Sequence, residues 1–206
     1  MSDSCCDGGL DVAELETRQR RVLIFVLVIN VVSFVVMAAG SILSGSSSLL
    51  SGMLDNLGDS LTYGLSLAVV GSSIMAKARV ALFKGALIAG AAIIVASQIF
   101  WHFTHLETPV VETMSVAALV NLAANIFCLW LLTPHRHSDI NMSSVWECSR
   151  NDIFDGIAVL LASFCVWLFN SAWPDLLVAI VLLILFSRSA VRVIRGAWHE
   201  LYPAVS

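Results

Sequence analysis

Long apolar runs separated by short polar segments dominate the chain from residue 22 onward. A helix needs about 20 mostly apolar residues to cross the hydrocarbon core of a membrane. Six runs reach this length, and the segments between them are too short to form a separate soluble domain. The pattern therefore predicts an all-α membrane protein with six transmembrane helices. These predicted helices cover residues 22–43, 49–74, 80–103, 112–132, 146–169 and 174–193.

Composition supports the membrane class and excludes two others. Of the 206 residues, 58% are hydrophobic and only 13% are charged, whereas soluble domains carry about 25% charged residues. The net charge is −4 and the basic residues form no patch or stripe, which argues against nucleic-acid binding. The five cysteines lack the spacing of a disulfide framework or a zinc knuckle.

The basic residues predict the orientation in the membrane. All eleven Lys and Arg lie in the segments before the first, third and fifth predicted helices and after the second, fourth and sixth, or in the adjoining ends of those helices. Short loops rich in Lys and Arg stay cytoplasmic, so both termini are expected inside. The small size and the lack of an organelle signal favour a prokaryotic inner membrane. We expect a cytoplasmic tail over 1–21, a transmembrane domain over 22–196 and a short cytoplasmic tail over 197–206.

Carboxylates lie where a membrane helix rarely tolerates them. Asp55 and Asp59, four residues apart in the second predicted helix, share one helix face. Asn151 and Asp155 have the same spacing in the fifth. No Lys or Arg lies mid-helix to neutralise these groups, so protons or a bound cation must do so. If the two faces meet, four oxygen donors would form a cage suited to a divalent cation.

The spacing leaves one ligand open. Asp152 lies three residues before Asp155, and helix neighbours at i+3 share a face as well as those at i+4. The fourth donor is therefore Asn151 or Asp152. Helix spacing by itself does not choose between them; the family resemblance described next favours Asn151.

The segment from Leu43 to Ser60 resembles the second-helix signature of the cation diffusion facilitator family, in which a Ser-Gly-Ser turn precedes Asp-x-x-x-Asp. Asn30, Asn121 and the Trp-Pro-Asp sequence ending at Asp175 resemble other family landmarks. The resemblance covers nearly the whole chain. It implies six helices, a metal site formed by the second and fifth helices, outward exchange of a divalent metal for protons, and a homodimer, here held by its transmembrane helices.

Two departures from the family pattern qualify this expectation. Family members usually carry His or Asp where this chain has Asn151, so the predicted metal ligands are Asp55, Asp59, Asn151 and Asp155. The family's cytoplasmic domain after the sixth helix is expected to be absent. We rank Zn²⁺ first as the transported ion, followed by Co²⁺ or Cd²⁺, then Fe²⁺ or Mn²⁺. The ion is cargo and no other cofactor is expected.

Other functions and other sites are weaker candidates. No nucleophile and base are grouped as an enzyme would require, so the alternative is a non-transporting metal sensor or assembly subunit. Several polar groups outside the helices are typical of solvated tails and loops, although they offer metal ligands. These are Cys5 and Cys6 in the first tail, His135, His137 and Asp139 in an inner loop, and His102, His105 and Glu107 near an outer one.

Overall fold

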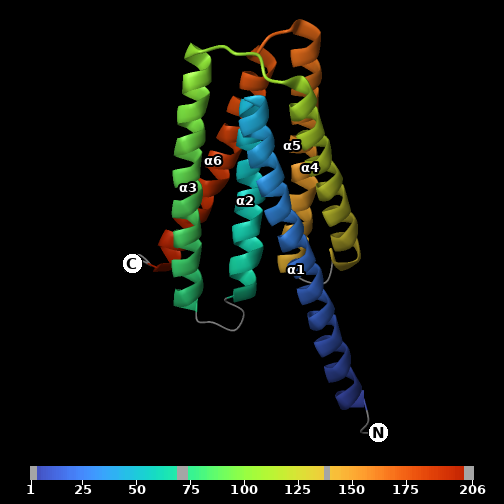
Figure 1. Ribbon diagram of the computed structural model, residues 1–206. Coiled ribbons are helices and arrows are strands. Elements are labelled where there is room, and N and C mark those ends of the chain that lie inside the picture. Colours follow the sequence, from blue (N-terminus) through green and yellow to red (C-terminus); the bar gives the residue numbers. More distant parts are fainter. Residues whose placement is uncertain (1–3, 69–73, 137–139, 202–206) are drawn as a thin grey trace.

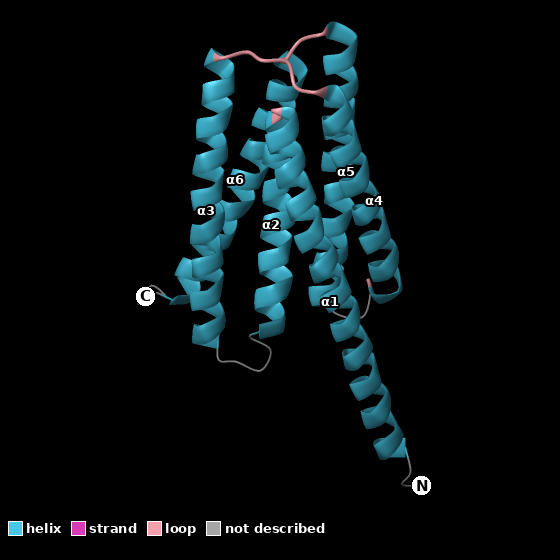
Figure 2. Cartoon of the chain, viewed as in Figure 1, coloured by secondary structure: helices cyan, strands magenta, loops and turns pink. Residues whose placement is uncertain are grey.

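The computed structural model describes residues 4–68, 74–136 and 140–201 of the chain. Within these residues the secondary structure is helical, without a strand (Figure 2). Six long helices run roughly along one direction (Figure 1), which confirms the predicted fold class. The helices are α1 (Ser4–Ser44), α2 (Ser47–Ala68), α3 (Ile74–Thr104), α4 (Val111–Leu132), α5 (Ile140–Phe169) and α6 (Trp173–Leu201), with a short 3-10 helix, η1 (Thr133–His135), after α4.

Several helices are longer than their apolar runs. Helix α1 begins at Ser4, within the segment expected to be a tail, and α6 continues to Leu201. Hydropathy marks only the part of a helix that lies in hydrocarbon, whereas backbone hydrogen bonding continues into the polar surroundings. The second predicted helix reached Ile74, which the structure assigns to α3; α2 is described as far as Ala68, and residues 69–73 of the predicted helix lie outside the described residues.

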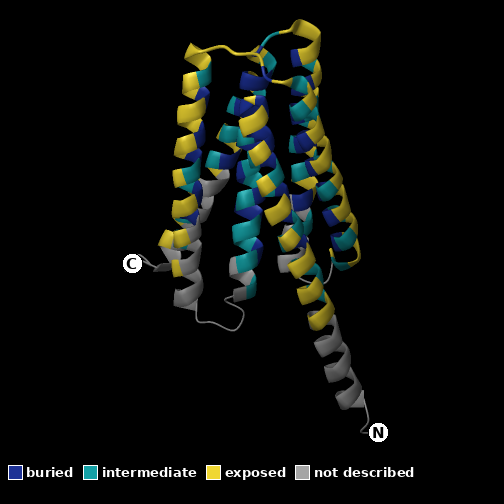
Figure 3. Cartoon of the chain, viewed as in Figure 1, coloured by how far each residue is buried: buried dark blue, intermediate teal, exposed yellow. Residues whose placement is uncertain are grey.

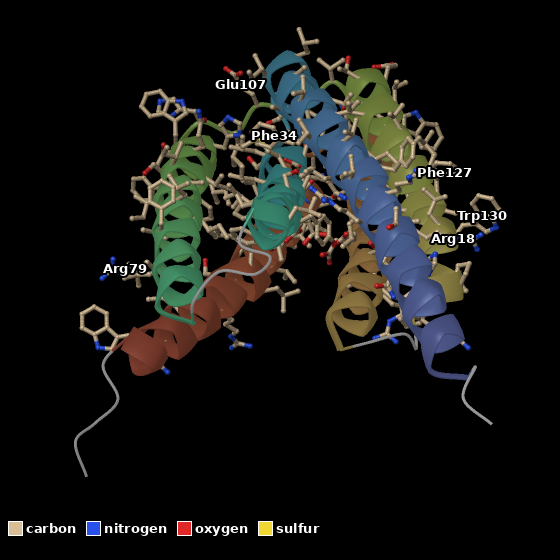
Figure 4. The ribbon with its side chains drawn as sticks, turned by 90° about the horizontal axis from the view of Figure 1, so that it is seen from below. Arg18, Phe34, Arg79, Glu107, Phe127 and Trp130 are labelled. Carbon is tan, nitrogen blue, oxygen red and sulfur yellow. The ribbon has the colours of Figure 1, made fainter. Side chains whose placement is uncertain are left out.

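The bundle has the surface of a membrane protein. Among the described residues, four segments are long and apolar enough to cross a bilayer: Thr17–Ser44, Gly85–Thr104, Val111–His135 and Ser149–Phe169. The outward sides of these helices are exposed and apolar (Figure 3). Figure 4 shows Phe127 and Trp130 of α4 pointing away from the bundle, with 49% and 67% of their surface exposed. The chain is an integral, multi-pass membrane protein.

Helix α2 lies at the centre of the bundle. It contacts every other long helix, and its residues are mostly buried or half-buried (Figure 3). The surrounding helices pack in pairs, α3 with α6 and α4 with both α1 and α5. Small residues permit the close approach of these helices. At Gly40 of α1, an added Cβ would lie 2.5 Å from the Cβ of Ala117 in α4. The central position of α2 explains how its polar side chains are shielded from lipid.

The outer end of α2 is capped by a residue from another helix. Ser46 donates its hydroxyl to Oδ1 of Asp175, and the backbone N–H groups of Ser47 and Ser48 donate to the same carboxylate at 2.7 and 3.1 Å. Asp175 is 1% exposed and lies in the first turn of α6. A carboxylate there satisfies backbone donors that a helix start leaves unpaired and complements the helix dipole. The Ser-rich turn is thereby held to α6.

The end of the bundle that holds both chain termini also holds the basic residues of the inner loops (Figure 1). There the guanidinium groups of Arg136 and Arg150 each lie within 6 Å of the centre of the Trp146 ring. The Trp146 indole N–H donates to Thr133 at 3.3 Å. Tryptophan and arginine at this level are typical of a membrane–water interface. This is the end that the sequence analysis expected to face the cytoplasm.

Candidate metal centre between α2 and α5

Four carboxylates from two helices form one cluster inside the bundle. Helix α2 supplies Asp55 and Asp59, and α5 supplies Asp152 and Asp155. The carboxyl groups of Asp55 and Asp155 lie within hydrogen-bonding reach of each other, and those of Asp59 and Asp152 do the same. Each pair therefore joins one residue of α2 to one of α5. The predicted meeting of the two polar faces is present in the structure.

One carboxylate of the cluster has an aromatic partner that the sequence analysis missed. The phenol of Tyr63 donates a hydrogen bond of 2.6 Å to Oδ2 of Asp59. Tyr63 is 1% exposed and Asp59 is 9% exposed, so this bond is shielded from water. Tyr63 follows Asp59 by four residues on the same helix, a spacing from which the contact was predictable. The bond therefore helps to orient the Asp59 carboxylate within the cluster.

A small cavity adjoins the carboxylates. It offers about 10 Å³ to the centre of a water-sized sphere, close to the minimum of about 10–15 Å³ that one water molecule needs. Three of the four carboxylates, those of Asp55, Asp152 and Asp155, line it together with amides from α2 and α4. The remaining lining residues are Met37, Gly52, Asn56, Asn121, Asn125, Gly156 and Val159. The cavity is therefore a space of atomic size whose wall combines carboxylates and amides with apolar groups.

The amides on the opposite wall come from α2 and α4. Asn56 donates its Nδ2 to Oδ1 of Asn121 at 3.0 Å, and both residues are almost fully buried. Asn125, one turn further along α4, is 2% exposed, and its Oδ1 has no hydrogen-bond partner among the described residues. Sequence analysis had singled out Asn121 but not Asn125. Their i, i+4 spacing was the available signal.

The structure separates the two candidates for the fourth donor. Asp152 lines the cavity and contacts Asp59, whereas Asn151 is exposed and is absent from the lining. Both residues share a helix face with Asp155 in the idealised pattern, so spacing alone did not distinguish them. The rotation of α5 about its axis does. Asp55, Asp59 and Asp155 are thus brought together as expected, and Asn151 is not brought into the same cluster.

The carboxylates are arranged as pairs. Within residues 4–68, 74–136 and 140–201, no three or more His, Cys, Asp or Glu side chains converge in a geometry that could hold a metal ion. A hydrogen bond between two carboxyl groups requires a proton on one of them. In this paired arrangement a cation would need these side chains to rotate toward a common point.

The secondary candidates lie elsewhere. At the outer end, His102 exchanges a hydrogen bond of 2.8 Å with Ser47, and His105 stacks on Trp101 with ring centroids 4.2 Å apart. His135 is half-buried in η1. The other predicted residues are not described in full. His137 and Asp139 lie outside the described residues, and the side chains of Cys5 and Cys6 lie outside the described side chains.

Comparison with known proteins identifies the family. Residues 23–202 match the profile of the cation efflux transmembrane domain. The chain is 25% identical over 201 residues to the zinc transporter ZitB of Yersinia pestis and 24% identical to that of Yersinia pseudotuberculosis. These matches cover 90% of this chain and 64% of each relative. With its six-helix bundle and buried carboxylates, the chain belongs to the cation efflux family, as its resemblance to cation diffusion facilitators predicted.

Proposed function

We propose that the protein is a secondary active transporter that exports a divalent transition-metal cation from the cytoplasm in exchange for protons. The observation that carries this proposal is the cluster of four carboxylates between α2 and α5. Carboxylates inside a membrane are costly unless protons or cations neutralise them. A group that alternates between the two is suited to exchange one for the other. We propose transport rather than catalysis, since both named relatives are transporters.

The proposed ligands are Asp55, Asp59 and Asp155 together with Asp152. The cross-helix contacts of Asp152 support this choice over Asn151, which the family resemblance favoured. Only oxygen donors are then available. Oxygen donors of this kind can bind Zn²⁺, Co²⁺, Fe²⁺ or Mn²⁺, and the relatives are named as zinc transporters. Zn²⁺ is therefore the first candidate for the transported ion.

Charge balance supports the coupling to protons. Each of the two carboxyl pairs holds one proton when it is hydrogen-bonded, which leaves the cluster with about two negative charges. One divalent cation on four deprotonated carboxylates leaves the same charge. Exchange of two protons for one cation thus keeps the buried charge constant, and so avoids the cost of an uncompensated charge in the membrane. We propose this stoichiometry for the transport cycle.

The family resemblance supports two further proposals. Two copies of the chain associate through their transmembrane helices, and the cation is cargo rather than a resident cofactor. Cross-linking of single-cysteine variants in native membranes would test the dimer. A cross-linked species of twice the monomer mass is expected, and its absence at every outward-facing position tried would argue against the association.

Flux in reconstituted vesicles tests the function. Wild-type protein is compared with Asp59→Asn and with Glu107→Gln, an exposed carboxylate outside the cluster, under an imposed pH gradient and with a panel of divalent ions. Gradient-dependent flux is expected in wild type and Glu107→Gln but not in Asp59→Asn, which must still elute as a folded species. Tight cation binding by wild type without flux would instead favour the metal sensor or assembly subunit.

A further inference from the structure

The unpartnered amide oxygen of Asn125 is unusual for its surroundings. The side chain is 2% exposed, and its Oδ1 is buried without a hydrogen-bond partner in the described part of the chain. A buried acceptor without a partner costs free energy, and most such groups in proteins are satisfied by protein or by an ordered water. We therefore expect the Asn125 Oδ1 to gain a partner when a ligand is bound.

A second buried asparagine on α4 has a hydrogen-bond partner from another helix. Asn121, one turn away on α4, has its Oδ1 engaged by the Nδ2 of Asn56 from α2. The two asparagines are equally buried and line the same cavity. Asn121 is thus a helix–helix contact, whereas the oxygen of Asn125 remains available. This difference separates a packing amide from one that can accept a ligand.

The cavity decides which ligand Asn125 can reach. Its wall joins Asn125 to Asp55, Asp152 and Asp155, and its volume of about 10 Å³ is that of a single water molecule or ion. Apolar groups and the paired amides of Asn56 and Asn121 complete the wall, so the acceptor oxygens left for a group at this point are those of three carboxylates and the Asn125 amide. Such a donor set is the one that hard and borderline divalent cations take.

We infer that the Asn125 amide oxygen is a further oxygen donor to the transported cation, supplied by α4 either directly or through one bound water. The inference rests on the proposed function. It makes the site one built from three helices, and the added donor is neutral, so it raises the coordination number without adding charge. Movement of α4 relative to α2 and α5 would then change the coordination of the ion.

The added donor is expected to affect ion selectivity. Zn²⁺ is satisfied by four ligands in tetrahedral geometry, whereas Mn²⁺ favours six oxygen ligands. Loss of the Asn125 oxygen should therefore weaken Mn²⁺ binding more than Zn²⁺ binding. A purely structural role would weaken both ions by the same factor.

Asn30 of α1 offers a matched control. It is 1% exposed, and its Oδ1 also lacks a partner, but it does not line the cavity. Its Nδ2 donates to the backbone of Val26 on its own helix. Asn30→Ala thus removes the same chemical group at similar burial without touching the proposed site.

The experiment compares wild type, Asn125→Ala, Asn125→Asp and Asn30→Ala as full-length protein. Zn²⁺ affinity is measured by calorimetry and Mn²⁺ affinity by displacement of Zn²⁺, and the KM and maximal rate of flux are measured in vesicles. We expect Asn125→Ala to weaken Mn²⁺ binding about tenfold, to change Zn²⁺ binding less, and to raise KM more than it lowers the maximal rate. Asn125→Asp, which keeps an oxygen, should restore Mn²⁺ binding, and Asn30→Ala should leave the ratio of affinities unchanged.

If Asn125→Ala weakened the binding of both ions equally, or of neither, the inference would be overturned. Metal flux by the wild-type protein would still support the proposed function. Conversely, the wild-type protein could bind both ions with the expected dependence on Asn125 but show no flux. That result would overturn the proposed transport function and support Asn125 as a ligand. Wild type that binds neither ion would overturn both.

Discussion

The carboxylate of Asp175, in the first turn of α6, accepts a hydrogen bond of 2.7 Å from the backbone N–H of Ser47, at the first residue of α2. The two residues are 128 positions apart in the chain. Helix α2 carries Asp55 and Asp59, so this contact helps to position the helix of the candidate site relative to α6. The cap is therefore part of what aligns the candidate site, although it lies at the first turn of the helix, eight residues before Asp55.

Substitution of Asp175 should loosen that end of α2. Asp175→Ala leaves two backbone N–H groups and the Ser46 hydroxyl without their acceptor. We expect a loss of about 2 kcal/mol in the free energy of unfolding, measured by denaturant titration in detergent. Glu107→Ala, an exposed carboxylate in the outer loop, serves as the control and should change stability little. An unchanged stability of Asp175→Ala would show that the cap is replaced by water.

Removal of the Tyr63 hydroxyl should affect the metal site without unfolding the protein. Tyr63→Phe keeps the ring but deletes the hydrogen bond to Asp59. Because partners that orient a ligand are worth about 10–100-fold in metal affinity, Zn²⁺ affinity should fall by about that factor in calorimetry. Affinity equal to that of wild type would mean that Asp59 is oriented by its other contacts.

The choice between Asp152 and Asn151 is testable by matched substitutions. Asp152→Asn removes a charge from the cluster while keeping its shape, and should abolish most of the pH-driven flux. Asn151→Ala changes an exposed side chain and should retain it. The opposite result, flux lost in Asn151→Ala and kept in Asp152→Asn, would restore the ligand set expected from the family resemblance. Flux is compared in vesicles containing equal amounts of each variant.

Cation binding should release protons. If each carboxyl pair gives up one proton, about two protons leave for each ion bound, and the apparent affinity should rise as the pH rises, by up to about 100-fold per pH unit. The number released is measured by titrating Zn²⁺ into detergent-solubilised protein in buffers of different ionisation enthalpy. Asp59→Asn should release fewer. Release of no protons by wild type would contradict the exchange.

Close helix packing predicts a further pair of variants. At Gly40, an added Cβ would lie within 2.5 Å of the Ala117 Cβ, which has no flexible end to move. Gly40→Ala should force α1 and α4 apart and lower stability by about 1–3 kcal/mol. Gly90→Ala, where nothing lies within 4 Å of the new atom, should be neutral or slightly stabilising. Thermal unfolding in detergent measures both, and equal melting temperatures would show that the α1–α4 contact adapts.

Local patterns along the chain determined the class of this protein. Apolar runs of membrane length predicted six helices, because every backbone polar group in hydrocarbon must be satisfied within the helix itself. The i, i+4 spacing of Asp55 and Asp59 predicted a polar face, and the absence of a mid-helix cation indicated protons or metal as its partner. Each of these inferences needs only neighbours in sequence.

The relations between helices depended on the tertiary structure. Whether Asp152 or Asn151 faces α2 depends on a rotation of α5 that both residues permit, and it was decided by how α5 packs against its neighbours. The capping of α2 by Asp175 and the free oxygen of Asn125 likewise depend on contacts between distant segments. Sequence spacing specifies which side chains share a helix face, but the direction in which that face points is set by packing across the whole bundle.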